Sequence, residues 1–283
     1  MELSHSVFTY VFLTIFFLSV GSLLNVVIYR LPLMLNNEWL KECCSLLKLA
    51  SVTPGNKPVN LFWPRSFCPS CNTQLKSYHN IPLLSYLLLH GECAFCQITI
   101  DKQYPLVELS TCLLSLFTVW WFGISVVCLF SLLFIWLLIP ITVIDYKHQL
   151  LPDSLSLSLL WLGLIANTEA LFTSLPNAVL SAAAAYISLW LFIKCFYLLT
   201  AKIGMGNGDF KLFAAFGAWF GWTQLPLILL LASVIGSIYG IIYLKVSKQN
   251  KETPIPFGPF LSLAGLVSLF FGNQIITFYL SLY

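Results

Sequence analysis

The sequence predicts an all-α integral membrane protein with about eight transmembrane helices and one polar loop domain after the first helix. Of the 283 residues, 59% are hydrophobic and only 9% are charged, whereas soluble domains carry roughly 25% charged residues. The mean hydropathy is +0.87. Apolar runs recur along the chain, and most of them reach the roughly 17–25 residues that a helix needs to cross a bilayer.

The predicted membrane segments follow these apolar runs in order. The first run is too long, and lacks the basic start, to be a cleaved signal peptide, for which an apolar stretch of about 7–15 residues is typical. The sixth is short, and we count it as a crossing because the charge pattern below requires it. The eight runs are Val7–Ile28, Leu106–Phe122, Ile124–Ile144, Leu155–Phe172, Asn177–Thr200, Phe210–Trp222, Leu225–Leu244 and Phe257–Leu282.

The placement of basic residues predicts the orientation. With eight crossings, all 14 Lys and Arg residues fall on one side of the membrane. By the positive-inside rule this side is cytoplasmic, so both termini are expected in the periplasm. Without the Phe210–Trp222 crossing, the basic residues at 245–251 would lie outside. The net charge of +3 is therefore no sign of a nucleic-acid partner, and none is expected; the apolar runs imply membrane lipid as a partner.

Two parts are expected along the chain. Residues 1–104 comprise the first membrane helix and a long polar loop, and residues 105–283 comprise seven closely spaced membrane helices. Within the loop, Glu38–Ala50 has apolar residues at helical spacing, and Asn36 or Asn37 can cap its start. This segment is expected to be a short helix that packs on the loop domain, with a helix lying on the cytoplasmic leaflet as the alternative.

Four cysteines in the loop predict a metal site. Cys68 and Cys71 form one C-x2-C pair, and Cys93 and Cys96 form a second. Two such pairs supply a tetrahedral four-sulfur shell for Zn²⁺, and since sulfur would fill every position, the site is expected to be structural. Two disulfides are the alternative, but a loop that faces the reducing cytoplasm argues against them. The zinc would stabilise a loop domain whose own core is small.

Two acidic residues lie at the predicted membrane edge. Asp145 ends the third apolar run and Asp209 begins the sixth, so both carboxylates are expected at the cytoplasmic ends of their helices. Ionisable groups at membrane depth are costly and by default indicate a functional site. The alternative is that Asp145 caps the loop after its helix and that Asp209 is the N-cap of the next one.

An adjacent pair of carboxylates suits peptide hydrolysis without a metal or a covalent intermediate. Two such groups a few ångströms apart do not both ionise easily, so they hold one proton between them. The ionised member then takes a proton from water, and the protonated member donates to the scissile carbonyl oxygen. Zinc proteolysis finds no support, because the chain has no H-E-x-x-H motif.

Small and acidic residues near this pair are candidates for supporting roles. Gly204, Gly206 and Gly208 precede Asp209 and would let a substrate strand approach the backbone. Asp153 follows Pro152 and is expected either to cap a helix or to support the site. Glu108 is interpreted as a structural carboxylate near the start of the second helix, where the helix dipole favours negative charge.

Several motifs together resemble the bacterial type IV prepilin peptidases, a family of membrane aspartyl proteases with a G-x-G-D motif. The resemblance spans nearly the whole chain. The segments that carry it are "GSLLNVVIYRLP" at 21–32, the four-cysteine loop with "NIPLLSYLLL" at 80–89, "YPLVELSTCLLS" at 104–115, "DYKHQLLPD" at 145–153, "GMGNGDFKLFAAFGAWFGW" at 204–222 and "PIPFGPFL" at 254–261.

The resemblance implies a specific activity. Asp145 and Asp209 occupy the positions of the family's catalytic aspartates, and the substrates would be prepilins and pseudopilins, cut after glycine on the cytoplasmic side of the inner membrane. The new N-terminal residue would be methylated from S-adenosylmethionine, an activity that the family associates with the cysteine loop. No glycine-rich nucleotide fingerprint is present, so no residue is assigned to the methyl donor. A peptidase without methylation, or an ion-coupled carrier that uses the same carboxylates, is the alternative.

Overall fold

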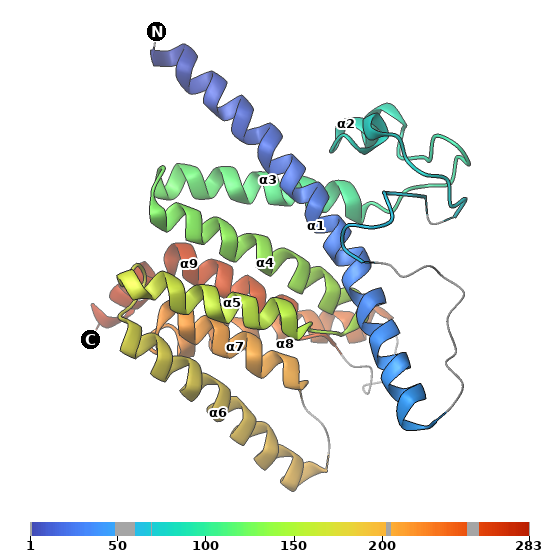
Figure 1. Ribbon diagram of the computed structural model, residues 1–283. Coiled ribbons are helices and arrows are strands. Elements are labelled where there is room, and N and C mark those ends of the chain that lie inside the picture. The colour runs from blue at the N-terminus through green and yellow to red at the C-terminus, as the bar shows by residue number, and fades with distance from the viewer. Residues whose placement is uncertain (1, 49–59, 69, 202–204, 248–254, 283) are drawn as a thin grey trace. The chain divides into compact units, whose positions relative to one another are not determined.

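The computed structural model describes residues 2–48, 60–68, 70–201, 205–247 and 255–282 (Figure 1). All regular elements in these ranges are helical, apart from two isolated β-bridges in the loop, and the all-α prediction is confirmed. The helices are α1 (Glu2–Leu46), η1 (Ser77–Asn80), α2 (Leu84–Leu88), α3 (Gln103–Phe122), α4 (Val126–His148), α5 (Asp153–Ala166), η2 (Asn167–Glu169), α6 (Leu175–Thr200), α7 (Asn207–Phe220), α8 (Leu225–Ser247) and α9 (Gly258–Leu280).

Each predicted apolar run overlaps one long helix, but the helices differ in length. Within the described ranges, six are long and apolar enough to cross a membrane, namely α1, α3, α4, α6, α8 and α9. Helices α5 and α7 have 14 residues each, which is less than the roughly 17 that a perpendicular crossing requires. The chain is thus a multi-pass membrane protein, and the count of eight crossings stays a prediction.

The first helix is longer than predicted. Helix α1 continues without interruption from Glu2 to Leu46, so the expectation of a separate helix capped at Asn36 or Asn37 is wrong. The end of that predicted helix, at Ala50, lies outside the described residues. Polar residues at 36–37 are compatible with a helix interior because tertiary and solvent context overrides weak propensities. Leu46 is exposed, with 82% of its surface accessible.

The chain divides into two compact units, residues 1–128 and 129–283, with the boundary inside α4. In the first unit, α1 packs closely along α3. A Cβ atom added to Gly21 would lie 2.7 Å from the Cα atom of Glu108, as expected where small residues let membrane helices approach. The Asn25 side chain also donates a hydrogen bond to the Tyr104 carbonyl (3.0 Å). The predicted division into functional parts at 104/105 stays a prediction.

Helix α7 forms the core of the second unit. Its side chains from Asp209 to Phe220 are buried with the exception of Lys211, and α5, α6 and α9 pack against it. Figure 1 shows α5, α6 and α7 side by side. The Phe134 ring of α4 contacts Trp219 edge to face, with ring centroids 4.9 Å apart. A helix that is apolar on every side belongs in a core, and α7 follows this rule.

One asparagine connects the end of α7 to the α5–α6 connection. The Asn167 side chain is fully buried and donates hydrogen bonds to the Ala218 and Trp219 carbonyls (2.7 and 3.0 Å). Its Oδ1 atom accepts hydrogen bonds from the backbone N–H groups of Phe172 and Thr173 (both 3.0 Å). The two carbonyls belong to the last turn of α7, which leaves them without helical partners, and the two N–H groups belong to the connection before α6.

Candidate active site and metal centre

Asp145 lies in the last turn of α4 and is buried, with 5% of its surface exposed. Its Oδ2 atom accepts a hydrogen bond from the backbone N–H of Gly258, the first residue of α9 (2.9 Å). The carboxylate therefore bonds a different helix, and the alternative that it caps the loop after α4 is not seen. The N–H donor favours the charged form of the carboxylate, whereas burial disfavours it.

Asp209 is the third residue of α7 and is also buried, with 6% of its surface exposed. The helix begins at Asn207 with Gly206 as its N-cap, so the alternative that Asp209 is the N-cap is wrong. The Oδ1 atom of Asp209 is buried and has no hydrogen-bond partner among the described residues. A buried polar atom without a partner is costly and suits a site that receives water or substrate.

The two carboxylates belong to one site. Asp145 is close enough for its charge to act on Asp209. Leu151, in the α4–α5 loop, lies beside both helices: its Cβ atom is 2.5 Å from the Cβ position of Gly208, and its Cδ2 atom is 3.3 Å from that of Gly258. The two acids, far apart in the sequence, thus lie near one another, and their role as a catalytic pair stays a prediction.

The glycines before Asp209 differ in surroundings. Gly206 is exposed, and an added Cβ atom there would meet only the Asp209 Oδ2 atom, at 3.6 Å, an ordinary contact. At Gly208 the same atom would collide with Leu151. Gly206 has an extended backbone, with φ −77° and ψ 154°, so neither position depends on a left-handed conformation. Gly204 lies outside the described residues.

Asp153 is the first residue of α5 and is not its N-cap, which is Pro152. Its carboxylate instead forms an ion pair with Lys211 on α7 (2.6 Å between Oδ1 and Nζ), and 60% of the Asp153 side chain remains exposed. Since Lys211 follows Asp209 by two residues, the ion pair joins α5 to the first turn of α7. The supporting role of Asp153 stays a prediction.

The four loop cysteines converge as predicted. All four are free thiols, and their sulfur atoms lie within 4.8 Å of one another. The sulfurs of Cys68 and Cys96 are 3.8 Å apart. A zinc ion bound at about 2.3 Å to four sulfurs in a tetrahedron separates them by about 3.8 Å, so the cluster has the dimensions of a metal site. The alternative of two disulfides is not seen.

The two cysteine pairs have the same local geometry. In each, the N–H of the first cysteine bonds the carbonyl five residues later, Cys68 to Thr73 (3.0 Å) and Cys93 to Ile98 (2.9 Å). A single β-bridge closes each turn, at Phe67–Gln74 and Glu92–Thr99. The residue after each second cysteine has a positive φ, 53° at Asn72 and 57° at Gln97. Repetition of one turn presents four sulfurs to a common centre.

The electrostatics of the cluster call for a cation. Hydrogen bonds from Thr73 lower the pKa of the Cys71 thiol to about 6. At Cys96 a backbone hydrogen bond from Ile98 lowers the pKa, but desolvation and the neighbouring sulfurs outweigh it and raise the pKa to about 11. Four thiolates therefore do not form together without a positive charge, which a bound metal ion would supply.

Comparison with known proteins gives matches in both halves of the chain. Residues 132–241 match the type IV leader peptidase family, and residues 15–122 match the bacterial peptidase A24 N-terminal domain. The chain is 54% identical over 273 residues to the prepilin leader peptidase/N-methyltransferase of Legionella pneumophila, covering 96% of this chain and 95% of that protein. The chain belongs to the type IV leader peptidase family. The resemblance deduced from the motifs is thereby confirmed.

Other relatives support the same family. The prepilin leader peptidase/N-methyltransferase of Pseudomonas aeruginosa is 49% identical over 263 residues, which cover 93% of this chain and 90% of that protein. The protein of the same name from Neisseria gonorrhoeae is 44% identical over 250 residues, 88% of this chain and 86% of that protein. No solved structure matches the chain.

Some site features of this type IV leader peptidase family member have no simple sequence signal. The contact of Gly258 with Asp145 comes from a backbone N–H, which every residue except proline carries. Glu108 was expected near a helix start, but it is the sixth residue of α3, and its Oε2 atom accepts a hydrogen bond from the Leu83 N–H (2.8 Å). It therefore fixes the loop before α2 to α3, and the dipole explanation is wrong.

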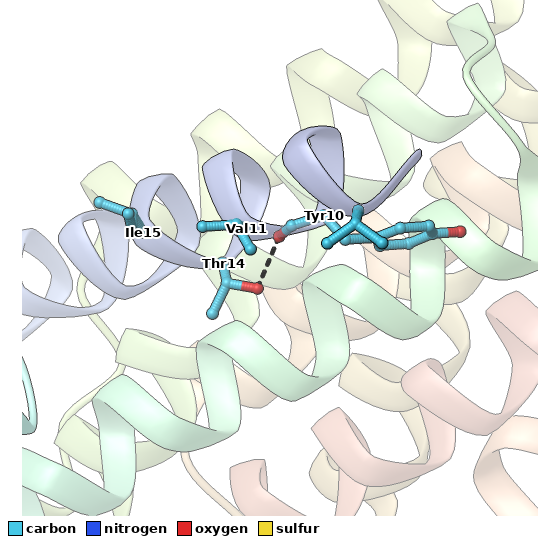
Figure 2. A pocket seen from close by; sticks show the side chains of 5 residues that line it. Tyr10, Val11, Thr14 and Ile15 are labelled. Atoms are coloured by element: carbon cyan, nitrogen blue, oxygen red, sulfur yellow. Dashed lines mark hydrogen bonds between the residues drawn. The ribbon is translucent and has the colours of Figure 1, made fainter. Parts of the chain in front are cut away.

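A hollow on α1 is the remaining candidate for a binding site. Figure 2 shows that it is lined by side chains of one helix only: Val7, Tyr10, Val11, Thr14 and Ile15. The Thr14 hydroxyl donates to the Tyr10 carbonyl (2.7 Å) and is thus engaged within the helix. An apolar, exposed surface on a membrane helix is what lipid contacts, so this hollow is interpreted as a lipid-facing surface.

Proposed function

We propose that the chain is a membrane aspartic endopeptidase that removes the leaders of type IV prepilins and type II secretion pseudopilins, with Asp145 and Asp209 as its catalytic pair. One observation carries the proposal: two buried carboxylates from α4 and α7 lie close enough to interact, in a protein of the type IV leader peptidase family. The relatives' name, prepilin leader peptidase/N-methyltransferase, supports the substrate class.

The pair would act by general acid and base catalysis. The ionised carboxylate takes a proton from water, and the water oxygen bonds to the scissile carbonyl carbon. The electron pair of the C=O bond moves to the oxygen, which receives the proton of the second carboxyl group. As the C–N bond breaks, one hydroxyl of the tetrahedral intermediate returns its proton to the second carboxylate and re-forms the C=O bond, and the amine nitrogen takes up the proton that the first carboxylate accepted. Atoms and charges balance without a covalent intermediate.

The glycines and the ion pair would support this reaction. Gly206 is exposed next to Asp209, so a substrate strand can approach its backbone without displacing a side chain. The Asp153–Lys211 pair fixes the first turn of α7 from outside. Both groups act on the position of Asp209 or of the substrate, and neither takes part in proton transfer.

We further propose that the new N-terminal residue is methylated with S-adenosylmethionine as donor, as the name of the relatives implies. Cys68, Cys71, Cys93 and Cys96 would hold a structural Zn²⁺, because four sulfurs at these separations complete its tetrahedral shell. With all four positions occupied by sulfur, the ion would stabilise the loop fold. Its role would be structural.

The proposed topology follows the charge pattern. The basic loops, including the four-cysteine loop, would face the cytoplasm, and both termini would lie in the periplasm of a bacterial inner membrane. Reporter fusions at residues 148 and 170 test this arrangement. Alkaline phosphatase should be active only when fused at residue 170, and activity at residue 148 instead would contradict the orientation.

The peptidase proposal is tested with purified full-length protein in lipid nanodiscs and a prepilin whose basic leader ends in glycine before phenylalanine. Asp145→Asn and Asp209→Asn should each abolish cleavage. Glu169→Gln, which removes an exposed carboxylate in the same compact unit, should cleave like the wild type. Thermal unfolding shows whether the variants are folded. Full cleavage by either aspartate variant would contradict the catalytic pair, and a wild type that moves ions without cutting would indicate a carrier.

The methyl transfer is tested separately on the same product. Mass spectrometry of the mature N-terminus should show one added methyl group only when S-adenosylmethionine is present. Asp145→Asn, given a product already cleaved by the wild type, should still methylate it. Cleavage without any mass increase would identify a peptidase that lacks the second activity.

A further inference from the structure

The start of α9 leaves one backbone donor for Asp145. The first four N–H groups of a helix have no partner within it. In α9 the N–H groups of Phe260 and Leu261 both bond the Phe257 carbonyl (3.1 Å each), and Pro259 has no N–H. The N–H of Gly258 remains, and its partner is the Oδ2 atom of Asp145 at 2.9 Å.

Glycine at position 258 makes this contact possible because it leaves room. An added Cβ atom would lie 2.5 Å from the Asp145 Oδ2 atom and 3.1 Å from its Cγ atom. Every other side chain would therefore displace the carboxylate or the start of α9. The backbone of Gly258 has no left-handed φ, so conformational freedom does not explain the residue.

The Leu151 side chain packs beside both Gly258 and Gly208. Its Cδ2 atom is 3.3 Å from the Cβ position of Gly258, and its Cβ atom is 2.5 Å from that of Gly208. Gly208 directly precedes Asp209. One side chain thus lies against the residue that bonds the first aspartate and the residue next to the second.

We infer that Gly258 is a positioning residue of the peptidase: its N–H holds the Oδ2 atom of Asp145, and its lack of a side chain leaves the carboxylate room to stay there. This inference rests on the proposed catalytic pair. With Oδ2 held, Oδ1 is the oxygen that takes the proton from water. The N–H donor and the positive end of the α9 dipole both favour negative charge on Asp145, which makes Asp145 the base and Asp209 the acid.

Two substitutions test the hydrogen bond and the space left by the missing side chain separately. Replacing Gly258 with glycolic acid by nonsense suppression removes the N–H and adds no atom, whereas Gly258→Ala keeps the N–H and adds the colliding Cβ. Gly240 of α8 is the matched control, since a Cβ atom there meets only Ile255, at 3.4 Å. Each variant is assayed as full-length protein in nanodiscs for kcat and KM on the prepilin substrate, and for its unfolding temperature.

The glycolic acid variant should lose about tenfold in kcat, the order expected for one hydrogen bond to a charged group. Gly258→Ala should lose about a hundredfold, because a displacement of about 1 Å at a catalytic group has that effect. KM should stay within about twofold in both, and the Gly240 variants should match the wild type. An unchanged kcat in the glycolic acid variant, or a rise in KM alone, would overturn the inference.

The experiment distinguishes a failure of the positioning role of Gly258 from a failure of the proposed catalytic pair. If Asp145→Asn and Asp209→Asn abolish cleavage while both Gly258 variants cleave normally, the catalytic pair stands and the positioning role of Gly258 fails. If the aspartate variants cleave normally, the proposed function fails before Gly258 is considered. A fall in unfolding temperature with Gly258→Ala leaves the glycolic acid variant as the deciding measurement.

Discussion

The two glycines beside Asp209 should respond differently to the same substitution. Gly208→Ala places a methyl group 2.5 Å from the Cβ atom of Leu151, whereas the new atom in Gly206→Ala has 3.6 Å to the nearest atom, Asp209 Oδ2. Ordinary carbon contacts lie at about 3.5–4.0 Å. The Gly208→Ala variant therefore requires a displacement of about 1 Å, and the Gly206→Ala variant requires none.

The magnitudes follow from these distances. Overpacking in a rigid core costs about 1–3 kcal/mol, and alanine recovers about 0.5–1 kcal/mol of helix propensity relative to glycine. Gly208→Ala should therefore destabilise the protein by roughly 0–2.5 kcal/mol. A shift of about 1 Å in the start of α7 should also lower kcat about a hundredfold. Gly206→Ala should lower stability by less than about 1 kcal/mol, the cost of a weaker N-cap.

Cleavage kinetics and thermal unfolding of the two variants, in the same nanodiscs, measure both effects. If a substrate strand lies along Gly206, as proposed, Gly206→Ala should raise KM while the apoprotein stays folded. The reasoning would be refuted if Gly208→Ala had the kcat of the wild type. It would also be refuted if Gly206→Ala lowered kcat as much as Gly208→Ala.

Three further predictions concern stability. Asn167→Ala should destabilise the second unit by about 2 kcal/mol or more, because it leaves two buried carbonyls without partners at about 1–3 kcal/mol each, besides two partly buried N–H groups. Denaturation monitored by Trp fluorescence measures this, and a loss below about 1 kcal/mol would contradict it. Chelation of the metal, or Cys71→Ser, should make residues 60–100 sensitive to an added protease, whereas digestion of residues 129–283 by that protease should not change. If residues 60–100 stayed resistant after metal removal, the ion would not be structural. Asp153→Asn should lower stability by at most about 1 kcal/mol, since its pair with Lys211 is largely exposed; a larger loss in thermal unfolding would show a stronger coupling of α5 to α7.

Periodicity and charge predicted much of this fold because the bilayer restricts the choices. Apolar runs in lipid form helices, since only helices and closed barrels satisfy their backbone groups there. The limits of individual helices were less predictable. Asn36 and Asn37 are typical caps, yet α1 continues through them to Leu46, because a cap preference of about 1 kcal/mol does not end a helix whose neighbours favour it.

The site was predictable where side chains carry the chemistry. Asp145, Asp209 and the four cysteines have types and spacings that indicate their roles, and the structure brings each set together. The contacts that hold the aspartates were not predictable. The Gly258 N–H is a backbone group, and Leu151 is one leucine among many; only the glycine before proline at the start of the last apolar run hinted at a special position.

The shortness of α7 has a consequence for the water that hydrolysis consumes. Fourteen residues extend about 21 Å, whereas the hydrocarbon layer is about 30 Å thick. If α7 crosses the membrane, at least one of its ends lies below the lipid headgroups, and Asp209 is the third residue from the first end. Water would then have to reach Asp209 below the level of the headgroups. A short α7 would thus let cytoplasmic water reach the peptide bond below the membrane surface.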